Sequence, residues 1–399
     1  MDKRLVLLGN LIALLASAQA ARAQELDALL PPGIPGYGDK FNVIAAHKSF
    51  VPGATGWEWS GMAIAPSLAM AAGYDSAPNG SAASALLTTT PSLLLTDPVA
   101  GFGAYAQVNE AAYPNNSVQN NFGAVFAGGE RIALPRETFT LSAAYAREAE
   151  TGFAINTVAL AKPLVFTVQD FHATDEIIAG MFTLTPDFAV TSYNFLFALQ
   201  NRRDDREALT LTYNPGGPLT YALRLHATQS DYRVSLYSAN TNEVLAGVED
   251  KADGLWTLSA LAGVAQRAPH VGSSLTAPVL EARLDWMPSD LDQVSLNLAH
   301  EIDDPDEVSA APYTLSEAKL TLRHEYLDSV TFKTLARISR ADYFGSDLRE
   351  TLFTGEMGLQ WRLSPALALN GDYTFNDRQA NYIDAANEHV LTLGLSWTP

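Results

Sequence analysis

Three short segments contain residue types that could carry enzyme or metal chemistry. Residues 101–106, Gly-Phe-Gly-Ala-Tyr-Ala, loosely match the glycine fingerprint of dinucleotide-binding proteins, but the helix that such a site needs is not predicted after them. Residues 272–274, Gly-Ser-Ser, lack the second glycine of a Gly-x-Ser-x-Gly nucleophile elbow. The acidic run at 303–307 lacks the glycine and the terminal glutamate spacing of a calcium loop. We interpret these segments as a glycine-containing strand, a loop and a solvated acidic loop.

The histidines are isolated from other catalytic residue types. His226 and His324 fall within expected strands, but nothing in the sequence connects either one to a serine nucleophile. The seven histidines show no metal-ligand spacing, and the chain has no cysteine, which excludes disulfides, thiol nucleophiles and zinc fingers. A formal net charge of −19 argues against a nucleic-acid partner. We therefore predict no catalytic residue, no metal, no cofactor and no enzyme activity.

Charged residues in the second half of the chain have a more regular pattern. They alternate with apolar residues along expected strands, so they lie together on one face. If that face lines a channel, opposite charges across it would create a transverse field that selects solutes. Alternatively, neighbouring charges pair along the wall and only keep the interior wetted. The predicted lumen-lining residues are Arg224, Glu281, Arg283, Asp285, Glu301, Glu317, Lys319, Arg323, Glu325, Lys333, Arg337, Glu356, Arg362 and Asp372.

The elements that would position these charges are β-strands of about ten residues, the length expected of strands that cross a membrane. From about Ser60 to the end of the chain, apolar residues recur at every second position. In the last such segment Leu391, Leu393, Leu395 and Trp397 share one face. A soluble β-sandwich alternates in the same way. Nearly the whole chain consists of such segments, however, and aromatic residues recur at their ends, as in the interfacial girdle of a transmembrane barrel.

Tight turns and longer polar connections alternate along the chain, as in outer-membrane barrels. Eight tight turns are predicted, one of them at Thr185-Pro186-Asp187, and with both chain ends in the periplasm they imply 18 strands. One strand cannot be placed clearly between Ala149 and Gly180, so 16 strands is the alternative. Pro66 lacks a backbone N–H, so the first strand is expected to start beyond it or to bulge there. The predicted fold is all-β, a single antiparallel up-and-down transmembrane β-barrel.

The start of the chain has the pattern of a signal peptide. Lys3 and Arg4 precede a short apolar stretch, and Ala21-Arg22-Ala23 provides a cleavage site, so residues 1–23 are expected to be removed. The apolar stretch is shorter than the roughly 20 residues of a membrane-spanning helix. Residues 24–56 do not alternate well and are predicted to be a periplasmic N-terminal segment or a plug in the lumen. The barrel is expected to occupy residues 57–399.

Several segments resemble the porin-like outer-membrane β-barrel proteins of Gram-negative bacteria, which are often encoded with exopolysaccharide synthesis and export genes. The resemblance covers most of the chain after the signal. Residues 65–75, which end in Gly-Tyr-Asp, resemble that family's first strand, and Thr90-Pro91-Ser92-Leu93 is similar to its second. Residues 284–288, 363–365 and 391–395 resemble its repeated hairpins. None of these motifs is catalytic.

This resemblance implies a function and a set of partners. It implies the terminal conduit of a polysaccharide export pathway in the outer membrane, working with periplasmic and inner-membrane export proteins, and surrounded by lipid and lipopolysaccharide. A general diffusion porin and a structural or adhesive barrel are the alternatives. The final residues resemble the signal read by the barrel-assembly machinery, with Thr392, Gly394 and Trp397, although Pro399 replaces the usual terminal aromatic residue.

Overall fold

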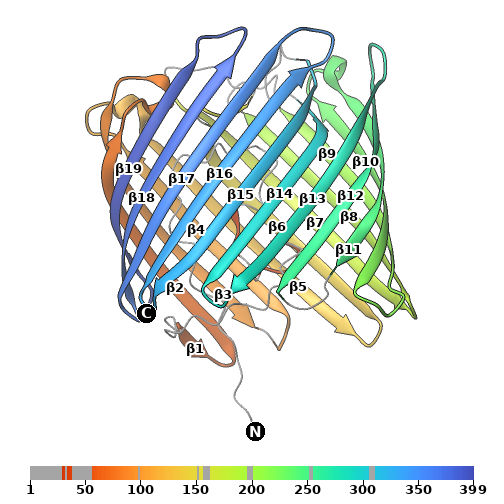
Figure 1. The fold of residues 1–399 in the computed structure, drawn as a ribbon, viewed down its shortest axis with the longest axis horizontal. Helices are drawn as coiled ribbons and strands as arrows, with labels where there is room; N and C mark the ends of the chain where they lie inside the picture. The colour runs from red at the N-terminus through yellow and green to blue at the C-terminus, as the bar shows by residue number, and fades with distance from the viewer. Residues whose placement is uncertain are drawn as a thin grey trace.

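A closed β-barrel forms nearly the whole of the protein in a computed structural model (Figure 1). The structure describes residues 29–31, 34–37, 56–97, 99–150, 152–155, 162–195, 201–250, 255–304 and 311–399. The strands are β1 (Trp57–Trp59), β2 (Met62–Asp75), β3 (Ser84–Asp97), β4 (Phe102–Ala112), β5 (Asn121–Leu134), β6 (Glu137–Glu150), β7 (Leu164–Ala179), β8 (Phe182–Phe195), β9 (Arg202–Tyr213), β10 (Leu219–Tyr232), β11 (Ala239–Asp250), β12 (Trp256–Pro269), β13 (Leu275–Ser289), β14 (Asp292–Asp303), β15 (Tyr313–Leu327), β16 (Val330–Tyr343), β17 (Arg349–Ser364), β18 (Leu367–Ala380) and β19 (Ala386–Trp397). Three short 3₁₀ turns lie in the connections, at Pro78–Gly80, Ser117–Gln119 and Ser235–Tyr237.

Eighteen of these strands, β2 to β19, close the wall. Each pairs antiparallel with the next in sequence, and β19 pairs back onto β2. The eight connections after the odd-numbered strands β3 to β17 have two to five residues, whereas the nine after the even-numbered strands have five to thirteen. The predicted fold and the count of 18 strands are confirmed, and 16 strands is excluded. Within the described residues no helix is long and apolar enough to span a membrane.

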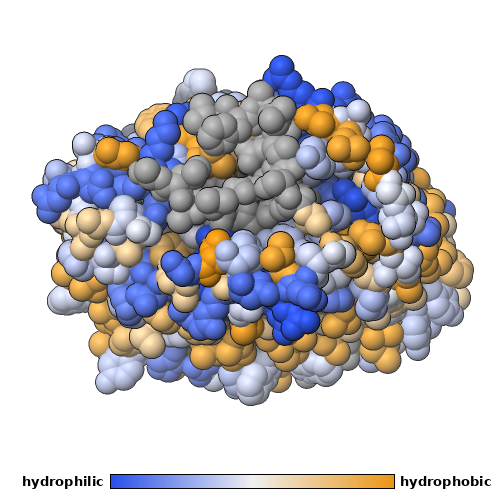
Figure 2. All heavy atoms as spheres, turned by 90° about the horizontal axis from the view of Figure 1, so that it is seen from above, coloured by the Kyte–Doolittle hydropathy of each residue, from blue (hydrophilic) through white to orange (hydrophobic). Residues whose placement is uncertain are grey.

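Side chains alternate between the two faces of the wall as the sequence pattern predicts. On β19, Leu391, Leu393 and Leu395 point outward and are about half exposed or more, whereas Val390 is buried on the inner face. Met357 on β17 is also strongly exposed on the outer face. Hydrophilic residues predominate around the rim that carries the longer connections, and apolar residues appear along the outer wall (Figure 2). The apolar face is therefore the one turned away from the lumen.

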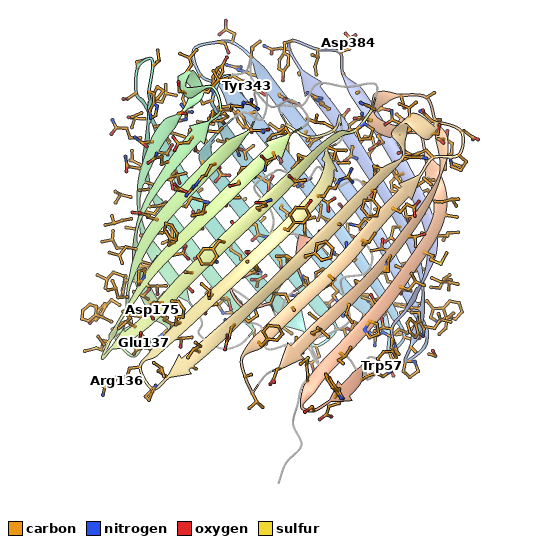
Figure 3. The ribbon with its side chains drawn as sticks, turned by 180° about the vertical axis from the view of Figure 1, so that it is seen from behind. Trp57, Arg136, Glu137, Asp175, Tyr343 and Asp384 are labelled. Carbon is orange, nitrogen blue, oxygen red and sulfur yellow. The ribbon has the colours of Figure 1, made fainter. Side chains whose placement is uncertain are left out.

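The two ends of the barrel differ in their side chains and connections. Trp57 and Arg136 lie at the end with the short connections, and Tyr343 and Asp384 lie at the opposite end (Figure 3). β1 is a short strand that pairs only with the start of β2 and exposes Trp57 and Trp59. Next to it, the Gly56 N–H donates to the Pro399 carbonyl at 2.9 Å. The beginning and the end of the barrel sequence therefore meet at the same rim.

The region that the sequence left ambiguous, residues 149–180, contains one long strand. β7 occupies the second half of this region, and its turn to β8 lies at residues 180–181, so the turn predicted at Thr185-Pro186-Asp187 is wrong. Pro186 instead lies within β8, where the β7–β8 ladder is interrupted between Ile177↔Leu184 and Thr174↔Asp187. A proline fits this position because no ladder bond needs its missing N–H.

The expectation for Pro66 is also corrected. β2 starts before it, at Met62, and pairs with β3 straight through the proline. On its other side β2 pairs with β1 up to Ile64 and with β19 only from Leu68 onward. Pro66 therefore lies in a gap between two partners, where β2 needs no donor, and no bulge is required.

Two glycines allow the barrel to close where β19 meets β2. A Cβ atom on Gly73 would lie 2.0 Å from the Leu391 carbonyl oxygen, and one on Gly394 would lie 2.6 Å from that of Met70. Both contacts are shorter than a real Cβ contact, so the two backbones approach more closely here than any other residue permits. Gly394, predicted from its resemblance to an assembly signal, thus has a packing role at the closing seam.

The outward orientation of Leu393 leads to a direct test of the strand register. Leu393→Arg should lower assembly strongly, because an arginine facing lipid near the middle of the membrane costs about 2–4 kcal/mol. Thr392→Arg, one residue away on the inner face, is the matched control and should assemble close to normally. The measurement is the amount of heat-modifiable barrel in the outer-membrane fraction. Equal levels of the two variants would contradict the assigned faces.

Candidate functional site

Part of the N-terminal region lies inside the barrel. Leu30, Ile34 and Tyr37 are at least nine-tenths buried and pack in one apolar cluster with side chains from the inner face of β4 to β8. The wall residues of this cluster are Tyr105, Val125, Ala127, Ala144, Ala146, Leu164, Phe166, Val168, Tyr193 and Phe195. Residues 29–37, here called the inner segment, therefore cover this part of the wall and narrow the lumen; within that range residues 32–33 are not described.

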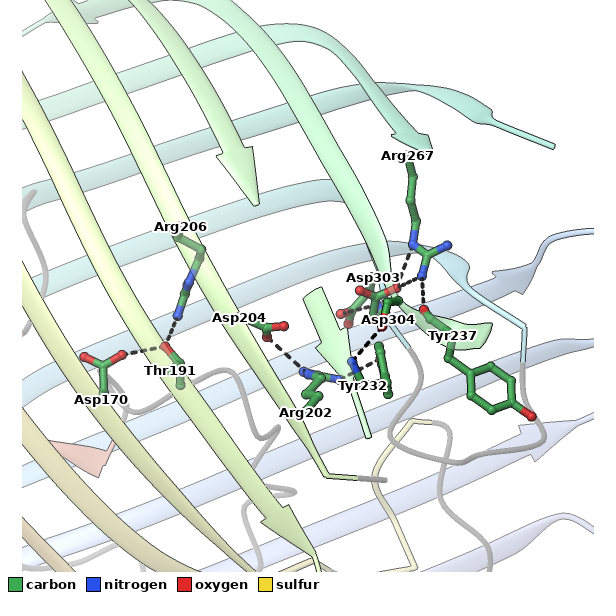
Figure 4. A network of polar contacts seen from close by, with 11 residues as sticks. Asp170, Thr191, Arg202, Asp204, Arg206, Tyr232, Tyr237, Arg267, Asp303 and Asp304 are labelled. Carbon is green, nitrogen blue, oxygen red and sulfur yellow. Dashed lines mark hydrogen bonds and ion pairs between the residues drawn. The ribbon is translucent and has the colours of Figure 1, made fainter. Parts of the chain in front are cut away.

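Polar contacts fix the inner segment in register with β7 and β8. The Tyr37 hydroxyl donates to Asp170 Oδ2 at 2.8 Å, and His172 Nδ1 lies 2.9 Å from the Gly36 carbonyl oxygen. His172 Nε2 lies 2.9 Å from Asp187 Oδ2. The Thr191 hydroxyl donates to the other Asp170 oxygen at 2.6 Å, and Arg206 donates to Thr191 (Figure 4). A continuous hydrogen-bond chain thus runs from the inner segment across three strands of the wall.

A second element enters the lumen from the same wall. The connection between β6 and β7, residues 151–163, is the longest in the barrel, and its Phe153 and Ile155 are buried. They pack against the inner faces of β15, β16 and β17. In the ring of strands, β15 to β17 lie about half way round from β6 and β7. Residues 152–155 of this connection, here called the crossing loop, therefore lie on the far side of the barrel interior from β6 and β7; residues 151 and 156–161 are not described.

A buried ion pair holds the crossing loop at its far end. Arg378 Nη1 donates to the Gly152 carbonyl at 2.6 Å, and the Gly152 N–H donates to Asn79 Oδ1. Arg378 Nε lies 2.5 Å from Glu350 Oε1, and both side chains are almost completely buried. The hydroxyl of Tyr382 donates to Glu350 at 2.9 Å. Burial raises the pKa of Tyr382, so this hydroxyl stays protonated and remains a donor.

All fourteen predicted lumen residues lie on strands β10 to β18, on the face opposite the apolar outer residues. Some of them form ion pairs along the wall, as one of the two sequence-based readings proposed; two pairs lie within one strand, and the third joins β10 to β13. The ion pairs are Arg224–Glu281 at 2.6 Å, Arg283–Asp285 at 2.5 Å and Arg323–Glu325 at 3.0 Å. Of the other members, Lys319, Lys333 and Arg337 lie together on β15 and β16, and the rest are spread over the wall.

Three of the basic residues are not ion-paired in this way and form a patch on β15 and β16. Lys319 lies directly opposite Arg337, and Lys333 lies directly opposite Arg323. Like charges opposite one another destabilise a sheet. Within the part of the chain that the structure describes, Lys319, Lys333 and Arg337 have no ion partner within 4.0 Å. Glu356 is an opposing charge that acts electrostatically on all three, and Asp372 also acts on Lys333.

The patch, defined as Lys319, Lys333 and Arg337, lies just inside the crossing loop. Leu315 on β15 and Ala341 on β16 contact the loop cluster, and Lys319 and Arg337 each follow four residues further along the same strands toward the short-connection rim. Gly358 leaves room between Lys333 and Asp372, because a Cβ there would lie 2.9 Å from Asp372 Oδ1. A solute that passes the loop would meet this patch next.

Sequence reasoning missed the polar residues on the inner wall of the first half of the barrel. Asp170 and His172 contact the inner segment, Asp187 bonds His172, and Arg202 pairs with Asp204 at 3.1 Å. Further along the wall Arg267 pairs with the loop residue Asp304 at 2.7 Å (Figure 4). The same alternation could have found the first two, since Asp170, His172 and Thr174 alternate with Phe171 and Ala173. Among the described residues no group of three or more His, Asp or Glu side chains could hold a metal ion.

A comparison with protein families identifies the chain. Residues 52–397, which include the whole barrel, match the family described as "Putative beta-barrel porin 2". The chain belongs to this beta-barrel porin 2 family. The match agrees with the closed 18-strand wall, its apolar outer face and its charged interior. The protein is therefore a porin-like channel of the outer membrane, as the resemblance to porin-like barrels implied.

A comparison with solved structures finds proteins of Pseudomonas aeruginosa. OccK2 (OpdF) of Pseudomonas aeruginosa is 12% identical, with a TM-score of 0.45, over 84% of this chain and 97% of that one. OccK1 (OpdK) of the same organism is 10% identical, with a TM-score of 0.48, over 84% and 99%. A structure of OpdK with vanillate has the same TM-score and identity. No curated protein matches this beta-barrel porin 2 chain in sequence.

Proposed function

We propose that this porin-like protein is a narrowed channel that selects small acidic solutes. The observation that carries the proposal is the patch of three lumen-facing cations without ion partners in the described wall. A fixed positive patch in a confined aqueous lumen attracts anions and lowers the barrier for their passage. Small solutes are favoured because the inner segment and the crossing loop both occupy the lumen.

The charges are placed so that they act across the lumen and not only along the wall. The patch lies on β15 and β16, about half way round the ring from Asp170 on β7. Opposite charges on facing walls produce a transverse field, which orients a solute that has both a charge and a dipole. This supports the transverse-field reading for the patch, whereas the Arg283–Asp285 and Arg323–Glu325 pairs support simple wetting of the wall elsewhere.

Export of an extracellular polysaccharide is the second candidate, and it rests on the sequence resemblance. An acidic polysaccharide carries many carboxylates, and it would meet the same patch on its way through the lumen. It would also need the inner segment and the crossing loop to leave room for a chain of sugars. The partners that the sequence suggests, namely periplasmic export proteins, the barrel-assembly machinery and lipopolysaccharide, are part of the same proposal.

The first test measures ion selectivity of the refolded chain in planar bilayers under a potassium chloride gradient. The wild type should favour chloride, and Lys319→Glu/Lys333→Glu/Arg337→Glu should favour potassium. An ion about 10 Å from each charge feels about 0.4 kcal/mol per unit charge in water. Changing six charge units therefore shifts the barrier of each ion by roughly 2.4 kcal/mol before salt screening, in opposite directions for chloride and potassium. Because salt screens most of this effect, we expect at least about a fivefold change in the permeability ratio.

The control is Arg340→Glu, because Arg340 lies on the same strand β16 but faces outward. It should leave selectivity unchanged. A wild type that favours potassium, or a triple variant that keeps wild-type selectivity, would refute the proposal.

Added uronic acid and acidic polysaccharide separate the two candidate functions. Block of the channel by the monomer supports a small-solute channel, and block by the polymer alone supports export. A well-folded barrel that passes no ions would support a structural role instead.

A further inference from the structure

The ring of His172 contacts an acceptor at each nitrogen. Nδ1 lies 2.9 Å from the Gly36 carbonyl oxygen, and Nε2 lies 2.9 Å from Asp187 Oδ2. The side chain is mostly buried, at 11% exposure. A carbonyl oxygen cannot donate, and a neutral imidazole carries a single N–H. Both hydrogen bonds can therefore form together only when the His172–Asp187 pair holds one additional proton.

The groups around the ring come from the inner segment and from strands β6 to β9. From β8, Asp187 is bonded to it directly, and from the inner segment the Tyr37 ring lies 6.4 Å away. Asp170 is two residues away on β7 and already accepts from Tyr37 and Thr191. From β9, Arg206 lies opposite Ala189 and donates to Thr191. From β6 the ring faces Ser142, which has no charge.

We propose that His172 is a proton-dependent latch that holds the inner segment against the wall of the lumen. With the added proton, the ring bonds Gly36 and Asp187 at once, and the inner segment is docked. When the pH rises and the proton leaves, one of the two bonds is lost, and the docked state is weakened. Histidine is the side chain that ordinarily changes charge between pH 5 and 8. The inner segment should thus be docked in acid and released more often in mildly alkaline medium, which would widen the channel.

The test uses the absence of cysteine, which allows a single probe to be introduced. Leu29→Cys on the full mature chain, labelled with a nitroxide and reconstituted in liposomes, reports the mobility of the inner segment by electron paramagnetic resonance. Between pH 5 and pH 8.5 we expect the ratio of mobile to immobile label to rise about tenfold, which corresponds to about 1.4 kcal/mol. Identical spectra at the two pH values would overturn the latch.

Three further variants in the same labelled background make the assignment specific. His172→Gln has no proton to lose, so its spectrum should not change with pH. Asp187→Asn should stay docked at pH 8.5, because an amide N–H can donate to the unprotonated Nε2. His226→Gln is the matched control and should keep the wild-type response. His226 also points inward, but its second nitrogen lies 3.2 Å from the Thr228 hydroxyl, which can donate or accept.

Only the predicted effect of the latch on transport depends on the proposed channel function. The latch and the channel function can therefore be refuted separately. Conductance recorded over the same pH range should rise with the mobile fraction. A mobile fraction that depends on pH without a change in conductance keeps the latch and refutes its role in the channel. A pH response that survives His172→Gln, or that His226→Gln removes, would overturn the latch itself. A docked Asp187→Asn variant at high pH excludes simple misfolding as the cause.

Discussion

Arg378→Met is expected to destabilise the rim with the longer connections by roughly 3–5 kcal/mol, because it leaves Glu350 buried without its partner. Both side chains are almost completely buried, and their contact is 2.5 Å. The tyrosine hydroxyls of Tyr343 and Tyr382 would still donate to Glu350, but neutral donors do not replace a cation. The measurement is the temperature at which the barrel loses its heat-modifiable mobility, and we expect a clear decrease.

The same variant should also free the crossing loop, since Arg378 donates to the Gly152 carbonyl at 2.6 Å. The double variant Arg378→Met/Glu350→Gln separates the two effects. Removing both charges should restore much of the thermal stability. It cannot restore the bond to Gly152, so the larger or noisier conductance expected of a loosened loop should remain. If Arg378→Met leaves both the transition temperature and the conductance unchanged, the anchoring role of this ion pair is wrong.

Ile34→Asp is expected to release the inner segment at every pH and to raise single-channel conductance roughly twofold or more, since conductance follows the free lumen. Ile34 is 1% exposed within the apolar cluster. Each such buried side chain contributes about 1.5–3 kcal/mol, and an unpaired carboxylate in its place is strongly unfavourable. The segment would leave the wall, while the barrel itself has no need to unfold.

The control for this prediction is Val99→Asp, because Val99 is 92% exposed in the short connection after β3. It adds the same charge without entering the lumen, so its conductance should equal that of the wild type. A wild-type conductance for Ile34→Asp in a correctly folded barrel would show that the inner segment does not limit the open channel.

The sequence pattern predicted the wall of the barrel because that information is local. Alternation along a strand fixes which side chains face lipid, and most strands pair with their sequence neighbours, so hairpin order follows from the turns. The prediction failed at Thr185-Pro186-Asp187 because we interpreted the proline as a turn residue. In the structure Pro186 lies inside β8, at a position where the β7–β8 pairing is interrupted. The sequence-based prediction also placed charged lumen residues only in the second half of the chain, because it did not recognise β7 as a strand.

The contents of the lumen could not be predicted in the same way. Tyr37 and Asp170 are separated by 133 residues, and Gly152 and Arg378 by 226. No periodicity relates such partners, since they meet only after the wall has curved into a ring. The sequence therefore left open whether residues 24–56 are periplasmic or a plug, and it gave no sign that the β6–β7 connection crosses the interior.

The seam between β2 and β19 has a consequence for how the protein reaches its native state. Every other neighbouring pair of wall strands is joined by a connection of at most thirteen residues, whereas Asp75 and its partner Val390 are more than three hundred residues apart. Closing so long a loop costs about 3 kcal/mol more chain entropy than closing a hairpin. The seam should therefore form last, from an open curved sheet whose two unpaired edges are β2 and β19. Unpaired edges promote aggregation, so these two strands are the surfaces that any folding helper has to protect.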